Sequence, residues 1–306
     1  MTNKIVSLLG CKYPILQSPM GWIARSQLAA AVCNAGGIGI IETSSGELEN
    51  CKAEIEKMPT ITDKIFGVNL PILFLKDDSM IEMVASCGVK FVTTSAGDPA
   101  KYIYKLKDAG ITVFHAVPSV MGAKKAIDAG VDGLVVEGTE GGGFKSSEEV
   151  GLHILLQAIR KLTDIPIVAA GGIVDGIGMA AAIASGADGI QMGTRFVSSK
   201  ESPVHENFKQ AIVSANEEGT WILNKKSKPC IRALKTEFTR NIHEAGQMDM
   251  SALGNIKDLY FGGDMNAAPA LSGQSCGLID KVKSVQEIID ETILGYNSTA
   301  KKMQIL

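Results

Sequence analysis

Two glycine-containing stretches could together hold a phosphate group. The first reads IPIVAAGGIVDG (residues 165–176) and the second DGIQMGTRF (residues 188–196), and each is a short apolar run that ends in glycine. Such a run predicts a buried strand followed by a tight loop. Free backbone N–H groups in the loop, and at the start of the helix expected after it, attract anions. Either stretch alone is typical of an ordinary strand-to-helix turn, but the pair favours a shared phosphate cup built from Gly171, Gly172, Gly193 and Thr194.

Other residues at the predicted strand ends suit binding better than acid–base chemistry. Asn69 could bond to the edge of a ring, and Met20 could pack on a ring face. Taken singly, each is more typical of a strand end that satisfies nearby backbone. No Ser–His–Asp set and no metal-binding cluster is visible, because the four histidines are far apart in the sequence. This set favours a planar cofactor with a phosphate tail, which would supply the reactivity.

The loop EGTEGGGFKSSEE, residues 137–149, is the most unusual segment. Its three consecutive glycines lose much conformational entropy on ordering, which indicates a backbone that passes close to something or moves. Glu137 and Glu140 are candidate polar contacts, although such acids more often face solvent or cap a helix. His115 is expected to close the fifth strand and to face the mouth. It is a candidate proton donor, with a purely structural histidine as the alternative.

The elements that would position these residues form a repeat. A helix end, a small residue, a glycine and then a strand recur along the chain, and further strand openings lie at Pro14, Ile65 and Pro166. Together they give eight candidate strands, which begin near residues 14, 38, 65, 90, 111, 132, 166 and 188. Amphipathic helices are expected between them, for example over residues 26–34, 80–87 and 123–129. The mean spacing of about 25 residues leaves room for one strand, one helix and two loops.

Eight such units predict an α/β fold, a (β/α)8 barrel. An open, doubly wound sheet is the alternative, but it usually carries its glycine-rich fingerprint after the first strand. Here the glycine-rich loops follow the seventh and eighth strands, where barrels commonly build a phosphate site.

The repeat stops after Val197. We therefore predict a barrel over residues 1–197 and a C-terminal helical cap over residues 198–306 that packs on the same barrel. Two breaks are expected to interrupt the helices of the cap, at residues 225–232 and 261–279. The second break is rich in small residues and reads as a loop laid over a ligand, with an ordinary helix connection as the alternative.

Composition narrows the classes of function. The 306 residues, of which 45% are hydrophobic and 21% charged, suit one large globular domain or two smaller ones. The net charge of −3 leaves no broad basic face for nucleic acid. No apolar run approaches the ~20 residues of a membrane span. The six cysteines are scattered without a C-x-x-C pair, which favours reduced thiols in a cytoplasm over disulfides or a zinc site.

Motifs of one family are spread over almost the whole chain. They are PILQSPMGWIA at Pro14, NAGGIGII at Asn34, FGVNL at Phe66, VTTSAGDP at Val92, VPSV at Val117, EGTEGGG at Glu137, AAGGIVDG at Ala169, QMGTRF at Gln191 and ALSGQSCGL at Ala270. In this combination the chain resembles the nitronate monooxygenase family, which also holds the FMN-dependent enoyl-acyl carrier protein reductases II. The combination is specific, although AGG and GTR alone are not.

The resemblance implies a barrel that binds FMN at its strand ends. The residues that it implies around the isoalloxazine ring and the ribityl chain are Met20, Gly21, Asn69, Glu137 and Gly142. Those that it implies at the phosphate are Gly171, Gly172, Gly193 and Thr194, with Gln191 and Met192 nearby. The implied phosphate site is the same cup that the glycines indicate.

One position departs from the family motif. The motif normally ends E-A-G-G-H, and its histidine serves as a base or as another active-site group. Here Phe144 stands in place of the histidine, and Gly141 replaces the alanine. Phenylalanine cannot accept a proton, which argues against a base-dependent oxidation of nitronates. A reductase is less affected, because hydride can come from reduced flavin and the proton from water, Lys145 or His115.

The sequence therefore favours an FMN-dependent oxidoreductase that uses NADH or NADPH to reduce an activated C=C bond, such as that of an enoyl thioester. The segments KESPVHENFKQAI at Lys200 and IRALKTEFTR at Ile231 resemble the enoyl reductase branch. The alternatives are a nitronate monooxygenase that uses O2 and another base, and a flavin-binding protein without catalysis. The expected partner is a small-molecule or acyl thioester substrate, without nucleic acid or membrane, and a homodimer would be ordinary for the family.

Overall fold

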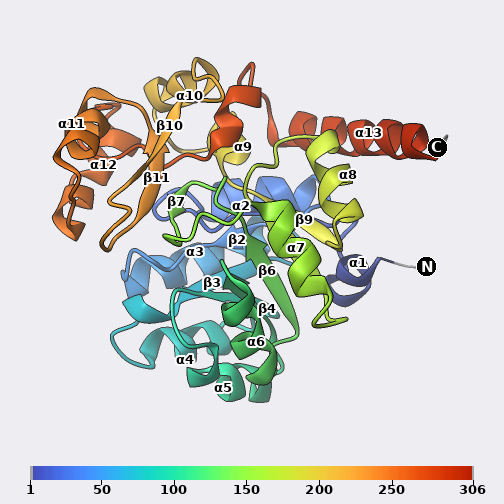
Figure 1. Cartoon of the computed structure of the whole chain (residues 1–306). Coiled ribbons are helices and arrows are strands. Elements are labelled where there is room, and N and C mark those ends of the chain that lie inside the picture. Colours follow the sequence, from blue (N-terminus) through green and yellow to red (C-terminus); the bar gives the residue numbers. More distant parts are fainter. Residues whose placement is uncertain (1–2, 305–306) are drawn as a thin grey trace.

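Eight parallel strands curve around a common axis in the computed structural model, which describes residues 3–304 (Figure 1). Their order in the sheet is β1-β9-β8-β6-β5-β4-β3-β2. Between the two end strands, Leu16 forms a parallel bridge with Ile38, and the backbone N–H of Gln17 donates to the carbonyl oxygen of Ile38 at 2.9 Å. These contacts close the sheet, and the predicted (β/α)8 barrel is confirmed.

The barrel strands begin one or two residues after their predicted starts. They are β1 (Ile15–Gln17), β2 (Ile40–Ile41), β3 (Gly67–Pro71), β4 (Phe91–Ser95), β5 (Thr112–Val117), β6 (Gly133–Glu137), β8 (Ile167–Ala170) and β9 (Gly189–Met192). The agreement is close because each start is marked locally, by a glycine or proline followed by an apolar run.

Helices cover the outside of the barrel between successive strands. They are α2 (Ser26–Asn34), α3 (Leu48–Ile61), α4 (Ser79–Ser86), α5 (Ile103–Asp108), α6 (Val120–Asp128), α7 (Leu152–Arg160) and α8 (Gly176–Ala184), with the short 3-10 turns η1 (Ile72–Phe74) and η2 (Pro99–Lys101). The three stretches predicted as amphipathic helices correspond to α2, α4 and α6. Their apolar faces pack against the sheet, as their periodicity requires.

The amino ends of the strands are filled by helix α1 (Lys4–Leu9). Its start is fixed by Asn3, whose side chain accepts hydrogen bonds from the backbone N–H groups of Ile5 and Val6. Ile5 and Leu9 are buried in the same cluster as Phe114 of the barrel interior. The open end of the barrel is therefore the one formed by the carboxyl ends of the strands.

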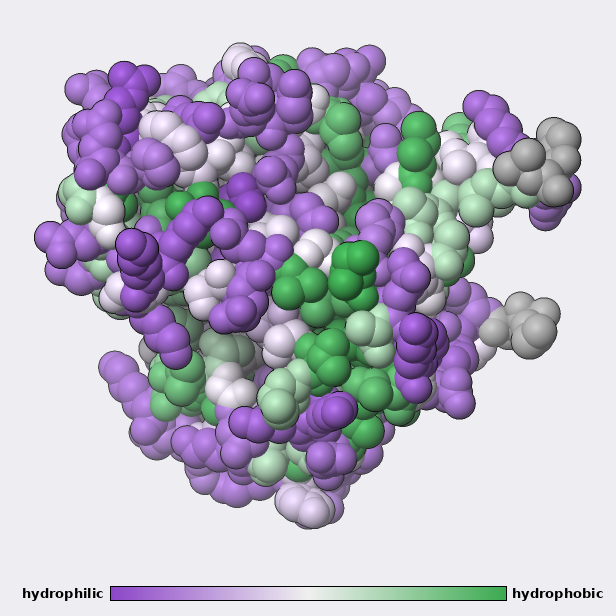
Figure 2. Space-filling view, viewed as in Figure 1, coloured by the Kyte–Doolittle hydropathy of each residue, from purple (hydrophilic) through white to green (hydrophobic). Residues whose placement is uncertain are grey.

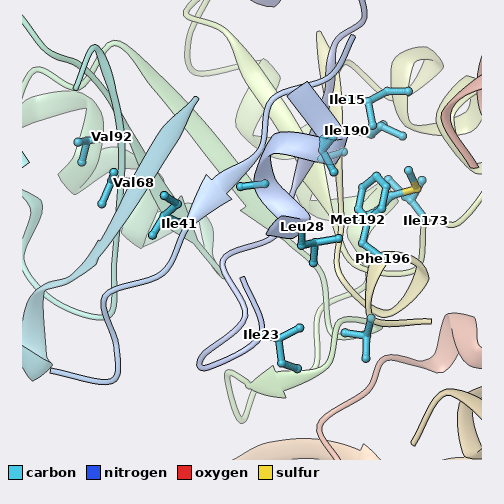
Figure 3. Packing of buried hydrophobic residues seen from close by; sticks show 14 of the residues in the cluster. Ile15, Ile23, Leu28, Ile41, Val68, Val92, Ile173, Ile190, Met192 and Phe196 are labelled. Carbon is cyan, nitrogen blue, oxygen red and sulfur yellow. The ribbon is translucent and has the colours of Figure 1, made fainter. Parts of the chain in front are cut away.

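Two layers of apolar side chains hold the barrel together. An inner cluster fills the barrel and includes Leu16 and Val168. An outer cluster lies between the sheet and the helices, and Figure 3 shows part of it, including Val68, Ile190 and Met192. Because successive residues of a strand point to opposite faces, membership of one cluster or the other shows which way a side chain points.

After β9 the chain builds a cap that lies to one side of the barrel (Figure 1). Its elements are α9 (Thr194–Val197), α10 (Glu206–Val213), β10 (Thr220–Leu223), β11 (Ile231–Leu234), α11 (Glu237–Ala245), η3 (Met250–Leu253), α12 (Ile256–Tyr260), η4 (Gln274–Leu278) and α13 (Val285–Met303). Residues 225–232, predicted as a break between helices, instead contain the turn of an antiparallel hairpin between β10 and β11. Strands of four residues are too short to show an alternating pattern in the sequence.

The hairpin is joined by a strand from the glycine-rich loop of the barrel. This strand, β7 (Gly143–Phe144), pairs antiparallel with β11, so that Phe144 lies opposite Ile231. The pairing fixes the loop of residues 137–149 to the cap. The glycine-rich loop, which the sequence assigns to the barrel, therefore contributes a strand to the sheet of the cap.

The last helix returns to the barrel. Helix α13 packs along α8 and also contacts α2, so it lies between the last and the first helices of the ring. The backbones of α8 and α13 come very close at Gly176, where an added Cβ atom would lie 2.1 Å from the backbone nitrogen of Tyr296. The predicted division of the chain after residue 197 stays a prediction.

The surface is mainly hydrophilic. On the face shown in Figure 2, charged and polar residues dominate the periphery, and apolar residues gather near the middle. Across residues 3–304, no helix combines the length and the apolar character that crossing a membrane would require.

Candidate functional site

Side-chain alternation decides which predicted residues face the mouth of the barrel. In β6, Val136 packs in the outer cluster and Val135 in the inner one, so Glu137 points inward. The same rule directs Asn69 of β3 inward, because both of its neighbours in the strand pack in the outer cluster. Gln191 of β9 points inward for the same reason. Three of the predicted residues therefore face one mouth.

Asn69 is held in place by the neighbouring strand. Its Nδ2 donates to Oγ1 of Thr93 at 3.0 Å and to the carbonyl oxygen of Thr93 at 3.1 Å. Thr43 Oγ1 donates to the backbone carbonyl of Asn69 at 2.7 Å. With its donor occupied and its side chain almost fully buried, Asn69 can present Oδ1 as an acceptor at a fixed position.

Glu137 forms an ion pair with Lys145. The Nζ of Lys145 contacts Oε1 of Glu137, and the lysine side chain is only 3% exposed. The backbone N–H of Lys145 donates to the carbonyl of Cys230 at 2.8 Å, which ties it to the cap. A cavity of about 10 Å³, enough for one water, is lined by Glu137, Lys145 and Pro118. The pair thus places an ammonium group at the mouth with room for one water beside it.

The glycines that were predicted to form the cup follow the ends of β8 and β9. Gly171 has φ 96° and Gly172 has φ 74°, in the left-handed region that favours glycine. A Cβ atom on Gly171 would lie 3.0 Å from the backbone nitrogen of Gly141. Among the hydrogen bonds of residues 3–304, none has the backbone N–H of Gly171, Gly172, Gly193 or Thr194 as its donor. Unpaired N–H groups gathered in one place suit an oxyanion, so this cup fits a phosphate.

Gln191 and Met20 lie beside the cup. The Nε2 of Gln191 donates to Ser18 Oγ at 3.3 Å. Its Oε1 is buried and has no hydrogen-bond partner in the described part of the chain. The Sδ of Met20 lies 3.7 Å from the place that a Cβ on Gly193 would take. A buried, unpaired acceptor at the mouth suits a ligand hydroxyl or N–H.

The loop that carries Met20 is firmly fixed. A Cβ atom on Gly21 would lie 2.9 Å from Ser44 Oγ, so the loops after β1 and β2 touch. Trp22 adopts φ 65°, which is uncommon for a bulky residue. Arg25 pairs with the buried Glu42 at 2.9 Å. Strained backbone held by tight contacts is typical of functional sites, and the sequence gives no sign of it at Trp22.

The small-residue segment 270–274 lies against both glycine loops. The backbone N–H of Gly273 donates to Thr194 Oγ1 at 2.9 Å. A Cβ atom on Gly142 would lie 2.6 Å from the carbonyl carbon of Ser272. The Oγ of Ser272 is buried and has no partner in the described structure. The sequence predicts a loop here but does not single out Ser272, because a serine among other small residues is not typical of any particular site.

His115 faces away from the mouth, contrary to the prediction. It lies two residues before the end of β5 and shares a face with Val113 and Val117, which pack in the outer cluster. Its Nδ1 lies 2.7 Å from Thr94 Oγ1, also on the outer face. The prediction was wrong because alternation along β5 puts His115 on the face of Val113 and Val117, which points to the helices.

Met192 also points outward. Its side chain is fully buried in the outer cluster, near Ile173 and Phe196 (Figure 3). Only its backbone remains near the cup: its carbonyl accepts a hydrogen bond from the N–H of Ser18 at 2.9 Å. A role for Met192 in binding would therefore be through the main chain.

Burial lowers the pKa of His115 to about 4. The unfolded chain binds a proton near pH 6.5 and the folded chain does not, so stability should fall as pH drops from about 6.5 to about 4, by roughly 3 kcal/mol. We expect His115→Asn to flatten this slope in urea unfolding while turnover at pH 7 is retained. His153→Asn, at an exposed position of α7, controls for loss of a histidine. Loss of turnover with an unchanged slope would contradict this structural role.

Phe144 stands at the mouth on β7 and leaves 46% of its surface exposed. Its ring centroid lies 6.0 Å from that of Phe74, and the two rings are tilted by 46°. Phe74 follows β3 in the turn η1. Nothing in the local sequence ILF marks Phe74 as part of a site, because only closure of the barrel brings it to Phe144.

Comparison with known proteins identifies relatives over most of the chain. A model of the nitronate monooxygenase family matches residues 2–80 and 72–295. A Rhodococcus jostii protein named (3aS,4S,5R,7aS)-5-hydroxy-7a-methyl-1-oxo-octahydro-1H-indene-4-carboxyl-CoA dehydrogenase is 34% identical, over 81% of this chain and 70% of that protein. A nitronate monooxygenase of Paraburkholderia phytofirmans is 28% identical, over 77% of each chain. The solved structure of FabK from Thermotoga maritima is 36% identical and superimposes with a TM-score of 0.95 over 99% of each chain.

Proposed function

Because the chain belongs to the nitronate monooxygenase family of flavin-dependent oxidoreductases, we propose that it uses FMN and NADH or NADPH to reduce an activated C=C bond, such as that of an enoyl thioester. The observation that carries this choice is the Phe144 ring at the mouth. Oxidation of a neutral nitroalkane first needs a proton acceptor that removes the α-proton and forms the nitronate, and phenylalanine is not one. Hydride transfer to a C=C bond has no such need.

The cup and the inward side chains would hold the cofactor. FMN, when bound, supplies the hydride from its reduced form. The unpaired N–H groups of Gly171, Gly172, Gly193 and Thr194 would bind its phosphate. The acceptors that would take hydrogen bonds from its ring and ribityl chain are Oδ1 of Asn69 and Oε1 of Gln191, with Met20 and Gly21 packed alongside.

Lys145 is the best-placed source of the proton. Reduction adds a hydride to one carbon of the double bond and a proton to the other. His115 cannot reach the mouth, since its ring faces the helices and burial holds it neutral at pH 7. The Lys145 ammonium lies at the mouth beside a one-water cavity, and Glu137 orients it. The proton would pass from Nζ directly or through that water.

The relatives support a thioester substrate. The name of the Rhodococcus jostii relative contains a carboxyl-CoA group, which is a thioester of coenzyme A. FabK, whose solved structure is similar over 99% of this chain, is an enoyl-acyl carrier protein reductase II. Both names describe those proteins, and a thioester substrate for this chain is our proposal.

Separate half-reactions test the proposed function. Purified holoprotein mixed with NADPH or NADH without oxygen should lose its flavin absorbance, and an enoyl thioester should then restore it. Flavin that neither nicotinamide reduces would refute the reductase. A protein that binds no flavin at all would refute the cofactor as well.

Phe144→His tests the alternative oxidation. The unchanged chain is expected to consume little oxygen with a neutral nitroalkane, because no base stands beside the substrate to remove its α-proton. The variant places an imidazole at the mouth and should raise oxygen uptake by about 10-fold or more, since a positioned base contributes 10²–10⁴-fold in typical enzymes. An oxygen electrode measures both. High uptake by the unchanged chain would favour a nitronate monooxygenase that uses another base.

A further inference from the structure

The contact between Phe74 and Phe144 crosses the mouth of the barrel. Phe74 follows β3, whereas Phe144 belongs to the loop after β6. In the sheet, strands β4 and β5 lie between β3 and β6. The loop after β6 therefore reaches past two intervening strands to bring the two ring centroids to 6.0 Å. The pair forms a roof over the strand ends that carry Asn69 and Glu137.

Both rings are carried by fixed backbone. On one side, the backbone N–H of Leu73 donates to the carbonyl of Ala96 at 2.8 Å, which holds the turn η1 against the loop after β4. On the other side, Phe144 pairs with Ile231 in the ladder between β7 and β11. The rings are therefore held in position by secondary structure and do not depend on mobile loops.

The pair offers an apolar surface near the polar side chains of Asn69, Glu137 and Lys145. Phe74 is 40% exposed, Phe144 is 46% exposed, and the neighbouring Leu73 is 75% exposed. The nearest charged group on the same loop, Lys145, is already paired with Glu137. Apolar surface that is held rigidly beside a reaction centre and left open is typical of a binding site for an apolar group.

We propose that Phe74 and Phe144 bind the apolar chain of the substrate, so that the enzyme selects medium and long acyl groups over short ones. The chain packs on the exposed faces of the two rings, while the double bond lies below them at the mouth. This inference rests on the proposed reductase function, and it assigns to Phe144 a role in specificity in place of the base. Each methylene buried against the rings should strengthen binding by about two- to fourfold.

The test compares trans-2-butenoyl, octenoyl and dodecenoyl thioesters of N-acetylcysteamine. We expect KM of the unchanged holoprotein to fall with chain length. Phe144→Ala and Phe74→Ala should each raise KM for the dodecenoyl substrate by about 10-fold and change KM for the butenoyl substrate by less than about twofold. Phe144→Leu, which keeps an apolar side chain, should retain most of the dependence. Tyr104→Ala, an exposed aromatic residue of α5, is the matched control.

A binding titration separates this inference from the proposed function. Each thioester is added to oxidised holoprotein, and the change in the flavin spectrum gives a Kd without any turnover. If no nicotinamide reduces the flavin but Kd still depends on chain length through Phe74 and Phe144, the reductase is refuted and the binding site stands. If Phe74→Ala and Phe144→Ala keep the chain-length dependence of the unchanged protein, or if that protein shows none, the binding site is refuted. Flavin content and thermal unfolding identify any variant that fails to fold, in which case the other of the two alanine variants decides.

Discussion

Gly171→Ala is expected to weaken FMN binding by about 10- to 100-fold while the barrel still folds. The native φ of 96° costs an alanine roughly 1–2 kcal/mol. The added methyl group would also lie 3.0 Å from the nitrogen of Gly141 and 3.2 Å from the carbonyl oxygen of Gly138, so the loop or the cup must shift. Each hydrogen bond to a charged group is worth about 1.5–3 kcal/mol, so losing one accounts for most of the effect. Fluorescence titration of the apoprotein with FMN measures it.

Gly130→Ala is the matched control for the backbone strain. Gly130 has φ 84°, and nothing lies within 4 Å of the position of its Cβ, at the end of α6. Gly130→Ala should lower the thermal stability about as much as Gly171→Ala does, and it should leave the Kd for FMN within about twofold of the unchanged protein. Normal FMN binding by Gly171→Ala would mean that the cup does not hold the phosphate. Equal weakening by both variants would point to a general loss of stability.

Lys145→Met should slow the reduction of the C=C bond by about 10²-fold, the lower end of the usual contribution of a positioned acid. The reduction of the flavin by NADPH should proceed at the usual rate, because that step takes no proton from Lys145. The side chain is 3% exposed, and methionine fills a similar volume without the charge. Glu137, which is 33% exposed, can be hydrated once its partner is removed. Stopped-flow measurement of the two half-reactions separates the effects.

Lys225→Met provides the control for loss of a lysine. Lys225 pairs with Glu149 at 3.0 Å and is 53% exposed, so its removal should change neither half-reaction. A normal rate of flavin reoxidation in Lys145→Met would show that water supplies the proton. Slowing of both half-reactions would indicate a disturbed flavin site and would remove Lys145 from the role of donor.

The outline of the barrel could be predicted because its signals are local. Each strand begins where a glycine or proline meets an apolar run, and the glycines that end helices lie at regular intervals. The hairpin of β10 and β11 could not be predicted in the same way. Its strands are four residues long, and one of them is completed by β7 from a different part of the chain.

The direction of a side chain on a strand was harder to predict than the strand itself. Glu137 and Asn69 face the mouth as expected, whereas His115 and the side chain of Met192 do not. Because side chains alternate, adjacent residues near one strand end point to opposite faces of the sheet, and locating the end of a strand does not show which of them faces the mouth. Sequence patterns locate strand ends only to within a few residues.

The sequence by itself determined the eight-unit barrel, and it predicted the glycine cup at Gly171 and Gly172 and, from the family motif, the phenylalanine in place of a histidine. These follow from residue types and short spacings. Only the tertiary structure decided what surrounds the cup and what Phe144 touches. The bond from Gly273 to Thr194 joins residues 79 positions apart, and Phe144 meets Phe74 across two intervening strands. Such contacts depend on closure of the barrel and the path of its loops, which no local pattern encodes.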